Sequence, residues 1–146
     1  MAQVVIVGAG PAGASLAYLL ARNGIEVTLL ERRQDFSREF RGEVLMPSGV
    51  NAFAQMGLLD RMLDVAHHSA EAISVYLNRN LIITQSLPAD VLQGTNIMAI
   101  SQPALLEMLV GECRQFPNFR FLRGAVLRGL LQNGGRVQGV RVTVDD

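Results

Sequence analysis

The fold of this chain is decided by the stretch VVIVGAGPAG, residues 4–13. Its first four residues form a β-branched run, which predicts a strand buried on both faces. Apolar residues then recur at helical spacing from Pro11, which suits the first turn of a helix, to the stop signal Asn23-Gly24. A second apolar run, residues 25–31, predicts another strand. Strand, helix and strand within about thirty residues make a βαβ unit, so the sequence predicts an α/β protein with a parallel sheet.

The glycines of this stretch follow the GxGxxG pattern of dinucleotide-binding domains. Gly8 permits the tight turn, Gly10 lets the backbone approach a pyrophosphate, and Gly13 lets the helix pack close to the strand. Pro11 and Ala12 open the helix, whose N–H groups would face the phosphates. The alternative interpretation is a glycine-rich turn that serves only the core of an α/β protein.

An acidic residue at the end of the second strand strengthens the dinucleotide interpretation. Glu31 follows the motif at close to the roughly 20 residues at which such domains place a ribose-binding acid. A carboxylate here argues against a ribose 2′-phosphate, although Arg32 and Arg33 beside it leave that question open. NAD-binding and FAD-binding domains share the motif, so its spacing does not distinguish the two cofactors.

Composition excludes several classes of function. The chain has 146 residues, of which 49% are hydrophobic and 18% charged, which is too apolar for a disordered protein. Thirteen basic and 13 acidic residues balance, so the charge predicts neither a nucleic-acid partner nor an anionic membrane surface. Every basic residue is an arginine, which excludes lysine chemistry such as a Schiff base.

Cysteine, histidine and hydropathy patterns predict a soluble, cytoplasmic protein without a metal site. Cys113 has no second cysteine with which to form a disulfide. The adjacent His67 and His68 match no zinc motif and are expected as exposed loop residues. No uncharged stretch reaches the roughly 18–20 residues that span a bilayer.

The rest of the chain predicts a mixture of helices and hairpins. Residues 32–47 lack a clear period and predict a long loop, after which Ser48 is expected to cap a helix that Gly57 ends. A hairpin is expected to turn at residues 78–80, and a tighter one at Asn133-Gly134-Gly135. Further strands are predicted at residues 98–101, 119–122, 126–131 and 137–144, with a helix after Ser101.

Four runs resemble the N-terminal portion of the FAD-dependent aromatic hydroxylases, the group A flavoprotein monooxygenases related to p-hydroxybenzoate hydroxylase. These runs are LLERR (29–33), FRGE (40–43), MPSGVNAFAQMGLLD (46–60) and SQPALLEML (101–109). The resemblance implies a Rossmann-like FAD-binding fold with a parallel central sheet and β-hairpin additions. It also implies a division into a first FAD-binding segment (1–66), the start of a substrate-domain hairpin insert (67–97) and a second FAD-binding segment (98–146).

The resemblance also implies cofactor contacts outside the glycine motif. In such families the arginine that matches Arg41 lies by the FAD phosphates, and the residue that matches Gln102 hydrogen-bonds the cofactor at the start of a helix. Backbone near Val126 would meet the adenine. From the residues alone, Arg41 beside a glycine is a plausible anion clamp, and a merely solvated arginine is the alternative. For Gln102 the alternative is an ordinary residue of the first helical turn. No side chain stands out as a catalytic acid or base.

Family members are much longer than this chain and carry two further cofactor motifs beyond residue 146. The resemblance therefore implies a fold that is incomplete at its C-terminus, a chain that is inactive alone, and sheet edges open to another chain, so that an oligomer is possible. The expected full-length activity is an NAD(P)H-dependent monooxygenase acting on an aromatic, isoprenoid or quinone-like small molecule. The alternatives are a reductase or halogenase-like FAD enzyme, an NAD-linked dehydrogenase, and a non-catalytic dinucleotide-binding module.

Overall fold

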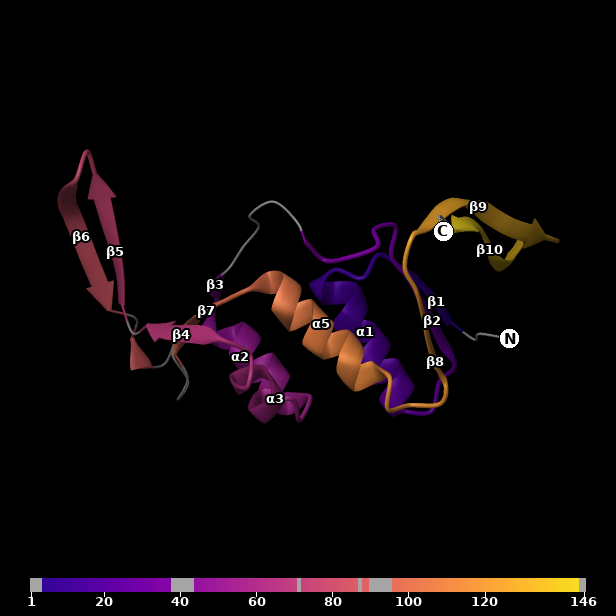
Figure 1. Cartoon of the computed structure of the whole chain (residues 1–146), viewed down its shortest axis with the longest axis horizontal. Coiled ribbons are helices and arrows are strands. Elements are labelled where there is room, and N and C mark those ends of the chain that lie inside the picture. Colours follow the sequence, from indigo (N-terminus) through magenta and orange to yellow (C-terminus); the bar gives the residue numbers. More distant parts are fainter. Residues whose placement is uncertain (1–3, 38–43, 71, 87, 90–95, 145–146) are drawn as a thin grey trace. The chain divides into compact units, whose positions relative to one another are not determined.

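The computed structural model describes residues 4–37, 44–70, 72–86, 88–89 and 96–144 (Figure 1). The backbone divides into two compact units. The first unit comprises Met1–Ser37 and Leu106–Asp146, and the second comprises Arg38–Leu105. Two stretches that are far apart in the sequence therefore build the first unit together.

A parallel sheet forms the centre of the first unit. Its strands are β1 (Val4–Val7), β2 (Val27–Leu30) and β8 (Phe119–Leu122), in the order β1-β2-β8. Helix α1 (Pro11–Arg22) joins β1 to β2, and the Leu106–Cys113 part of helix α5 (Gln102–Cys113) precedes β8. Both helices lie on the same side of the sheet (Figure 1). This follows because the strand order β1-β2-β8 runs in one direction and crossover connections between parallel strands are right-handed. The predicted α/β fold with a parallel sheet is confirmed.

Small side chains let α1 lie close to this sheet. The buried residues of the helix are Ala14, Ala17, Tyr18 and Ala21, which recur at the spacing of one helical face. The larger Leu16 and Leu19 lie on the exposed side. The helical period is therefore as predicted, but alanine rather than leucine covers the strands.

Strand β1 is only partly buried, and the prediction of a strand covered on both faces is wrong at its end. Ile6 is buried, whereas Val7 is 51% exposed. Within the described residues β1 pairs with β2 alone, so it forms an edge of the sheet. A run of valine and isoleucine predicts an apolar strand, but it does not indicate how many neighbouring elements pack against that strand.

Asn118 fastens the end of α1 to the start of β8. Its side-chain amide donates to the carbonyl oxygens of Ala21, at 2.9 Å, and Ile25, at 2.7 Å. The backbone carbonyl oxygen of Asn118 accepts a hydrogen bond from the backbone N–H of Val27 at 2.9 Å. One asparagine therefore satisfies backbone groups at the helix end and fixes the first residue of β2.

The second unit contains a small antiparallel sheet with two helices. The sheet order is β3 (Val44–Leu45), β7 (Ile97–Ile100), β4 (His67–Ala70), and the helices are α2 (Pro47–Gln55) and α3 (Leu59–Leu63). Helix α2 begins one residue before the predicted cap: Met46 is the N-cap and Pro47 the first helical residue, because proline is favoured at that position. The two histidines lie in β4, not in a loop, because they pair with Ile100 and Ala99 of β7.

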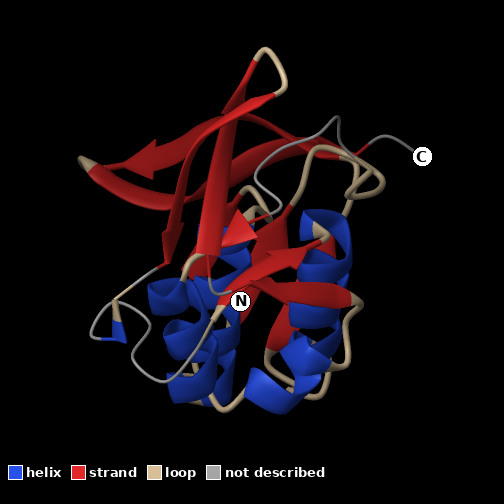
Figure 2. Ribbon diagram, turned by 90° about the vertical axis from the view of Figure 1, so that its left-hand side faces the viewer, coloured by secondary structure: helices blue, strands red, loops and turns tan. Residues whose placement is uncertain are grey.

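Two hairpins complete the chain, and both were predicted. Strands β5 (Ala72–Leu77) and β6 (Asn80–Ser86) are joined by two residues, and so are β9 (Ala125–Asn133) and β10 (Arg136–Val144). Each hairpin forms a two-stranded ribbon with a short loop at its tip (Figure 2). Gly134 and Gly135 have φ of 57° and 75°, and Asn78 and Arg79 have 49° and 66°. Two positive φ values in a row are the signature of a type I′ turn.

Candidate dinucleotide-binding site

Two glycines of the turn after β1 are required by the fold itself, one by its backbone conformation and the other by close packing. Gly8 has φ of +99°, a conformation that other residues rarely adopt, and its N–H donates to the carbonyl oxygen of Leu30 at 2.7 Å. At Gly13 a Cβ atom would collide with the carbonyl oxygen of Gly8 and lie 3.3 Å from a methyl carbon of Ile6. The first turn of α1 is therefore packed directly against the backbone that leaves β1.

Gly10 differs from both. It has the ordinary backbone angles φ −69° and ψ 180°, and a Cβ atom placed there would meet no atom of the described residues within 4 Å, apart from its chain neighbours. Neither strain nor packing among the described residues requires a glycine at this position. Bare backbone that faces open space at the start of a helix is what the close approach of a phosphate group needs.

The N-terminus of α1 lies next to this open space. Gly10 is the N-cap, no side chain caps the helix, and its first turn contains no acidic residue. Pro11 and Ala12 are exposed. Backbone N–H groups and the positive end of the helix dipole attract anions, so this end of α1 fits a phosphate.

The Glu31 carboxylate is fixed at the same end of the sheet. It follows β2, is only 4% exposed, and accepts hydrogen bonds at both oxygens. Oε2 accepts from the backbone N–H of Ala9 at 2.9 Å, and Oε1 accepts from that of Arg33 at 3.1 Å. A carboxylate can accept about four hydrogen bonds, so a carboxylate held by backbone N–H groups can also accept hydrogen bonds from ribose hydroxyls.

The backbone of Glu31 also connects the strands around it. Its N–H donates to the carbonyl oxygen of Leu122 at 2.9 Å, and its carbonyl oxygen accepts from the N–H of Ala125 at 2.9 Å. Ala125 is the first residue of β9, so the half-buried Val126 lies one residue from a direct partner of Glu31. The structure therefore gathers the glycine turn, Glu31 and the start of β9 within one unit.

The remaining predicted site residues are placed differently. Arg32 is exposed directly after Glu31. Gln102 is half-buried and is the first residue of α5, within the second unit. Arg41 lies outside the described residues. Sequence reasoning missed Ala9, whose side chain has no chemistry and whose contribution is its backbone N–H to Glu31.

Cys113, the last residue of α5, carries a buried free thiol. Burial raises the pKa of the Cys113 thiol from 9.0 to about 12, and the charge of Glu112 adds to the rise. We expect the native chain at pH 8 to react with a thiol reagent such as 5,5′-dithiobis(2-nitrobenzoate) far more slowly than the urea-unfolded chain, since the thiolate is the reacting form. Equal rates in the two states would contradict the burial.

The same pKa gives the sign of a pH effect on stability. The folded thiol keeps its proton up to about pH 12, whereas the unfolded thiol ionises near pH 9.0. The free energy of unfolding should therefore hold its full thiol contribution below pH 9 and decrease as the pH rises towards 12. A Cys113→Ala chain should lack this part of the decrease, which urea titrations of both chains at several alkaline pH values would measure.

Two arrangements are absent from the part of the chain that the structure describes. In residues 4–37, 44–70, 72–86, 88–89 and 96–144 there is no group of three or more His, Cys, Asp or Glu side chains arranged to hold a metal ion. No helix in those ranges has both the length and the apolar character needed to span a membrane.

Solved structures share this fold. The p-nitrophenol 4-monooxygenase PnpA from Pseudomonas putida DLL-E4 superposes with a TM-score of 0.82 over 97% of this chain and 38% of its own, at 24% identity. PqsL from Pseudomonas aeruginosa, in complex with 2-aminobenzoylacetate, gives a TM-score of 0.81 over 94% of this chain and 38% of its own, at 20% identity. At these identities the likeness establishes the fold.

Sequence comparison establishes the family. The chain is 34% identical over 141 residues to 6-methylpretetramide 4-monooxygenase of Streptomyces rimosus, which covers 94% of this chain and 33% of that protein. It is 30% identical over 150 residues to squalene monooxygenase of Mus musculus, covering 95% and 24%. The chain thus spans a third or less of the length of these relatives. The family described as "FAD binding domain" matches residues 1–146, and the chain belongs to that family of FAD-binding domains.

Proposed function

We propose that this chain binds the adenosine diphosphate part of FAD between the N-terminus of α1 and Glu31. One observation carries the proposal: open backbone at Gly10 lies at an anion-attracting helix end, and the adjacent Ala9 N–H holds the buried Glu31 carboxylate. The pyrophosphate would lie over the turn from Gly8 to Gly13, with Pro11 and Ala12 in the first turn of the helix. The ribose hydroxyls would donate to Glu31.

Further contacts are proposed from the resemblance. The exposed Arg32 follows Glu31 in the sequence, and the half-buried Val126 follows Ala125, whose N–H donates to the Glu31 carbonyl oxygen. Their closeness to Glu31 supports contact of both residues with the adenosine. Arg41 would pair with the phosphates, and Gln102 would hydrogen-bond the cofactor from the first turn of α5. When bound, FAD would supply the redox chemistry that these side chains lack, with a nicotinamide cofactor as the proposed electron donor and dioxygen as the proposed acceptor.

We propose that the whole protein is an NAD(P)H-dependent monooxygenase. The relatives named above are by name monooxygenases of 6-methylpretetramide and of squalene, which supports an aromatic, isoprenoid or quinone-like small molecule as substrate. Because the chain spans a third or less of their length, we expect that it does not turn over substrate alone. In this interpretation residues 67–97 begin a substrate domain between two FAD-binding segments, 1–66 and 98–146. A cytoplasmic location and an oligomer formed through sheet edges such as that of β1 remain part of the proposal.

The test is a Glu31→Gln chain titrated with FAD. One carboxylate oxygen becomes an amide group that can no longer accept from a ribose hydroxyl, and hydrogen bonds to charged groups contribute about 1.5–3 kcal/mol each. We therefore expect FAD affinity to fall by about tenfold to a hundredfold, measured by flavin fluorescence.

The matched control is Glu26→Gln, an exposed glutamate that precedes β2 instead of following it. It should bind FAD like the unchanged chain. Far-UV circular dichroism would show that both variants are folded, because Glu31 also holds two backbone N–H groups. Unchanged affinity in a folded Glu31→Gln chain would remove Glu31 from the site.

A further inference from the structure

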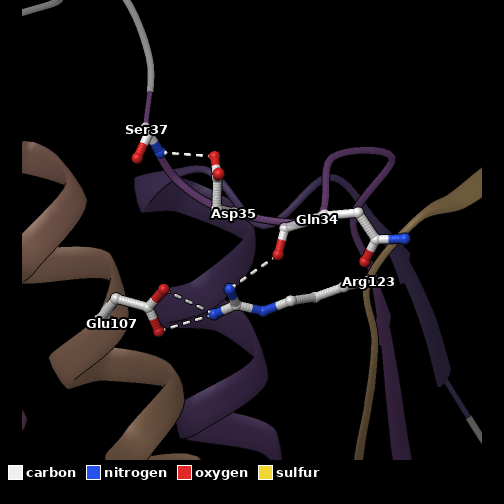
Figure 3. Close-up of polar contacts among 5 residues, drawn as sticks. All are labelled: Gln34, Asp35, Ser37, Glu107 and Arg123. Carbon is white, nitrogen blue, oxygen red and sulfur yellow. Dashed lines mark hydrogen bonds and ion pairs between the residues drawn. The ribbon is translucent and has the colours of Figure 1, made fainter.

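Arg123 joins three separate parts of the first unit. It directly follows β8, and its Nη2 donates to both carboxylate oxygens of Glu107 on α5, at 2.7 and 2.6 Å. Its Nη1 donates to the carbonyl oxygen of Gln34, in the loop after β2, at 3.0 Å. Figure 3 shows the guanidinium between the helix and this loop. Strand, helix and loop are therefore connected through one side chain.

Two aromatic rings shield this guanidinium. Phe36 and Phe121 stack with centroids 6.2 Å apart and planes 14° from parallel, and the guanidinium carbon lies 4.9 and 5.2 Å from the two centroids. Phe36 is buried, and the Arg123 side chain is only 24% exposed. A cation held over aromatic faces and partly removed from water interacts more strongly than an ordinary surface ion pair.

The loop that Arg123 holds is the loop that holds Glu31. Gln34, whose carbonyl accepts from Arg123, follows Arg33, whose N–H donates to Glu31 Oε1 at 3.1 Å. The carbonyl oxygen of Arg33 accepts from the N–H of Gly124, the residue after Arg123, at 3.2 Å. Further on, Asp35 Oδ1 accepts from the N–H of Ser37 at 2.9 Å (Figure 3). A continuous series of contacts thus runs from Glu107 through Arg123 and the loop to the Glu31 carboxylate.

We infer that Arg123, oriented by Glu107, is a positioning residue for cofactor binding. It fixes the backbone at Arg33 and Gln34 so that the Glu31 carboxylate is held towards the ribose hydroxyls. The inference rests on the proposed function, because it assumes that Glu31 meets an adenosine ribose. If the inference holds, loss of Arg123 reduces the discrimination for ribose hydroxyls more than it reduces binding of the rest of the nucleotide.

The test compares ADP with 2′,3′-dideoxy-ADP, which lacks both hydroxyls, by isothermal titration calorimetry on the full chain. We expect the unchanged chain to bind ADP about tenfold more tightly than the dideoxy nucleotide, the equivalent of about 1.4 kcal/mol. In Arg123→Ala and Glu107→Gln the preference should largely disappear, with ADP affinity reduced about tenfold and dideoxy-ADP affinity nearly unchanged. Arg123→Lys keeps the charge without the planar fork and should lose most of the preference too.

Arg120→Ala is the matched control, since Arg120 is an exposed arginine on β8 itself and should leave the preference intact. Thermal unfolding by circular dichroism identifies the folded variants, and Arg123→Lys and Glu107→Gln provide the answer if Arg123→Ala does not fold. Equal losses for both nucleotides in the folded variants, or an undiminished preference, would overturn the inference alone. If the unchanged chain binds neither nucleotide, or binds both equally, the proposed contact of Glu31 with ribose is wrong and the inference is overturned with it.

Discussion

Gly10→Val is expected to abolish FAD binding and to leave the chain folded. A Cβ atom at Gly10 meets no atom of the described part of the chain within 4 Å, apart from its chain neighbours, and the backbone there has angles that any residue adopts. The two valine methyl groups would instead occupy the space that we assign to the pyrophosphate. Flavin fluorescence titration should show an affinity loss of more than a hundredfold, since the phosphate could no longer reach the N–H groups of the helix.

Two further glycine variants make this result specific. Gly10→Ala adds one carbon and should weaken binding to an intermediate extent. Gly111→Ala, in α5, also places its Cβ atom in open space and should leave binding unchanged. Retained flavin in Gly10→Val would show that the pyrophosphate lies elsewhere, whereas a loss of helical signal in that variant would show that Gly10 has a role in the fold.

Gly13→Ala should have the opposite profile, a loss of stability that is present without any cofactor. Its Cβ atom would collide with the Gly8 carbonyl oxygen, which is backbone and cannot rotate away as a side chain would. Overpacking of this kind costs about 3 kcal/mol, because helix and strand must separate. Urea unfolding of the chain without FAD should show this as a midpoint at a lower urea concentration.

Gly139→Ala is the control for the second glycine. Its Cβ atom would lie 3.7 Å from a methyl carbon of Leu131, an ordinary contact, so the midpoint should change little. An unchanged midpoint in Gly13→Ala would mean that α1 is not packed on the start of the turn as described. The two sets of variants therefore distinguish Gly10, a glycine that ligand binding requires, from Gly13, a glycine that the fold requires.

The order and type of the elements in the first unit follow from local sequence. Val4–Val7, Pro11–Arg22 and Phe119–Leu122 lie where apolar period and turn residues predict them. Exposure was less predictable, because it depends on neighbours that a single segment does not reveal. Val7 is exposed for want of a second neighbouring strand in the described sheet, and His67 is in a strand because it pairs with Ile100 far along the chain.

The candidate site divides in the same way. The glycine turn and Glu31 were predictable because the glycine pattern and its spacing from Glu31 can be recognised within a short stretch of sequence. Arg123 was not singled out, because its Gln34 partner is 89 residues away and nothing near Arg123 distinguishes it from the other arginines of the C-terminal strands. Asn118, which holds Ala21 from 97 residues away, was missed for the same reason.

The two hydrogen bonds to Glu31 have a thermodynamic consequence for ligand association. Ala9 and Arg33 already restrict this carboxylate in the free chain. Freezing a freely rotating side chain on complex formation costs about 0.5–1.5 kcal/mol, and here that entropy is lost during folding instead. The Glu31 carboxylate is preorganised, so each hydrogen bond from a ribose hydroxyl should lower the dissociation constant with little cost in conformational entropy.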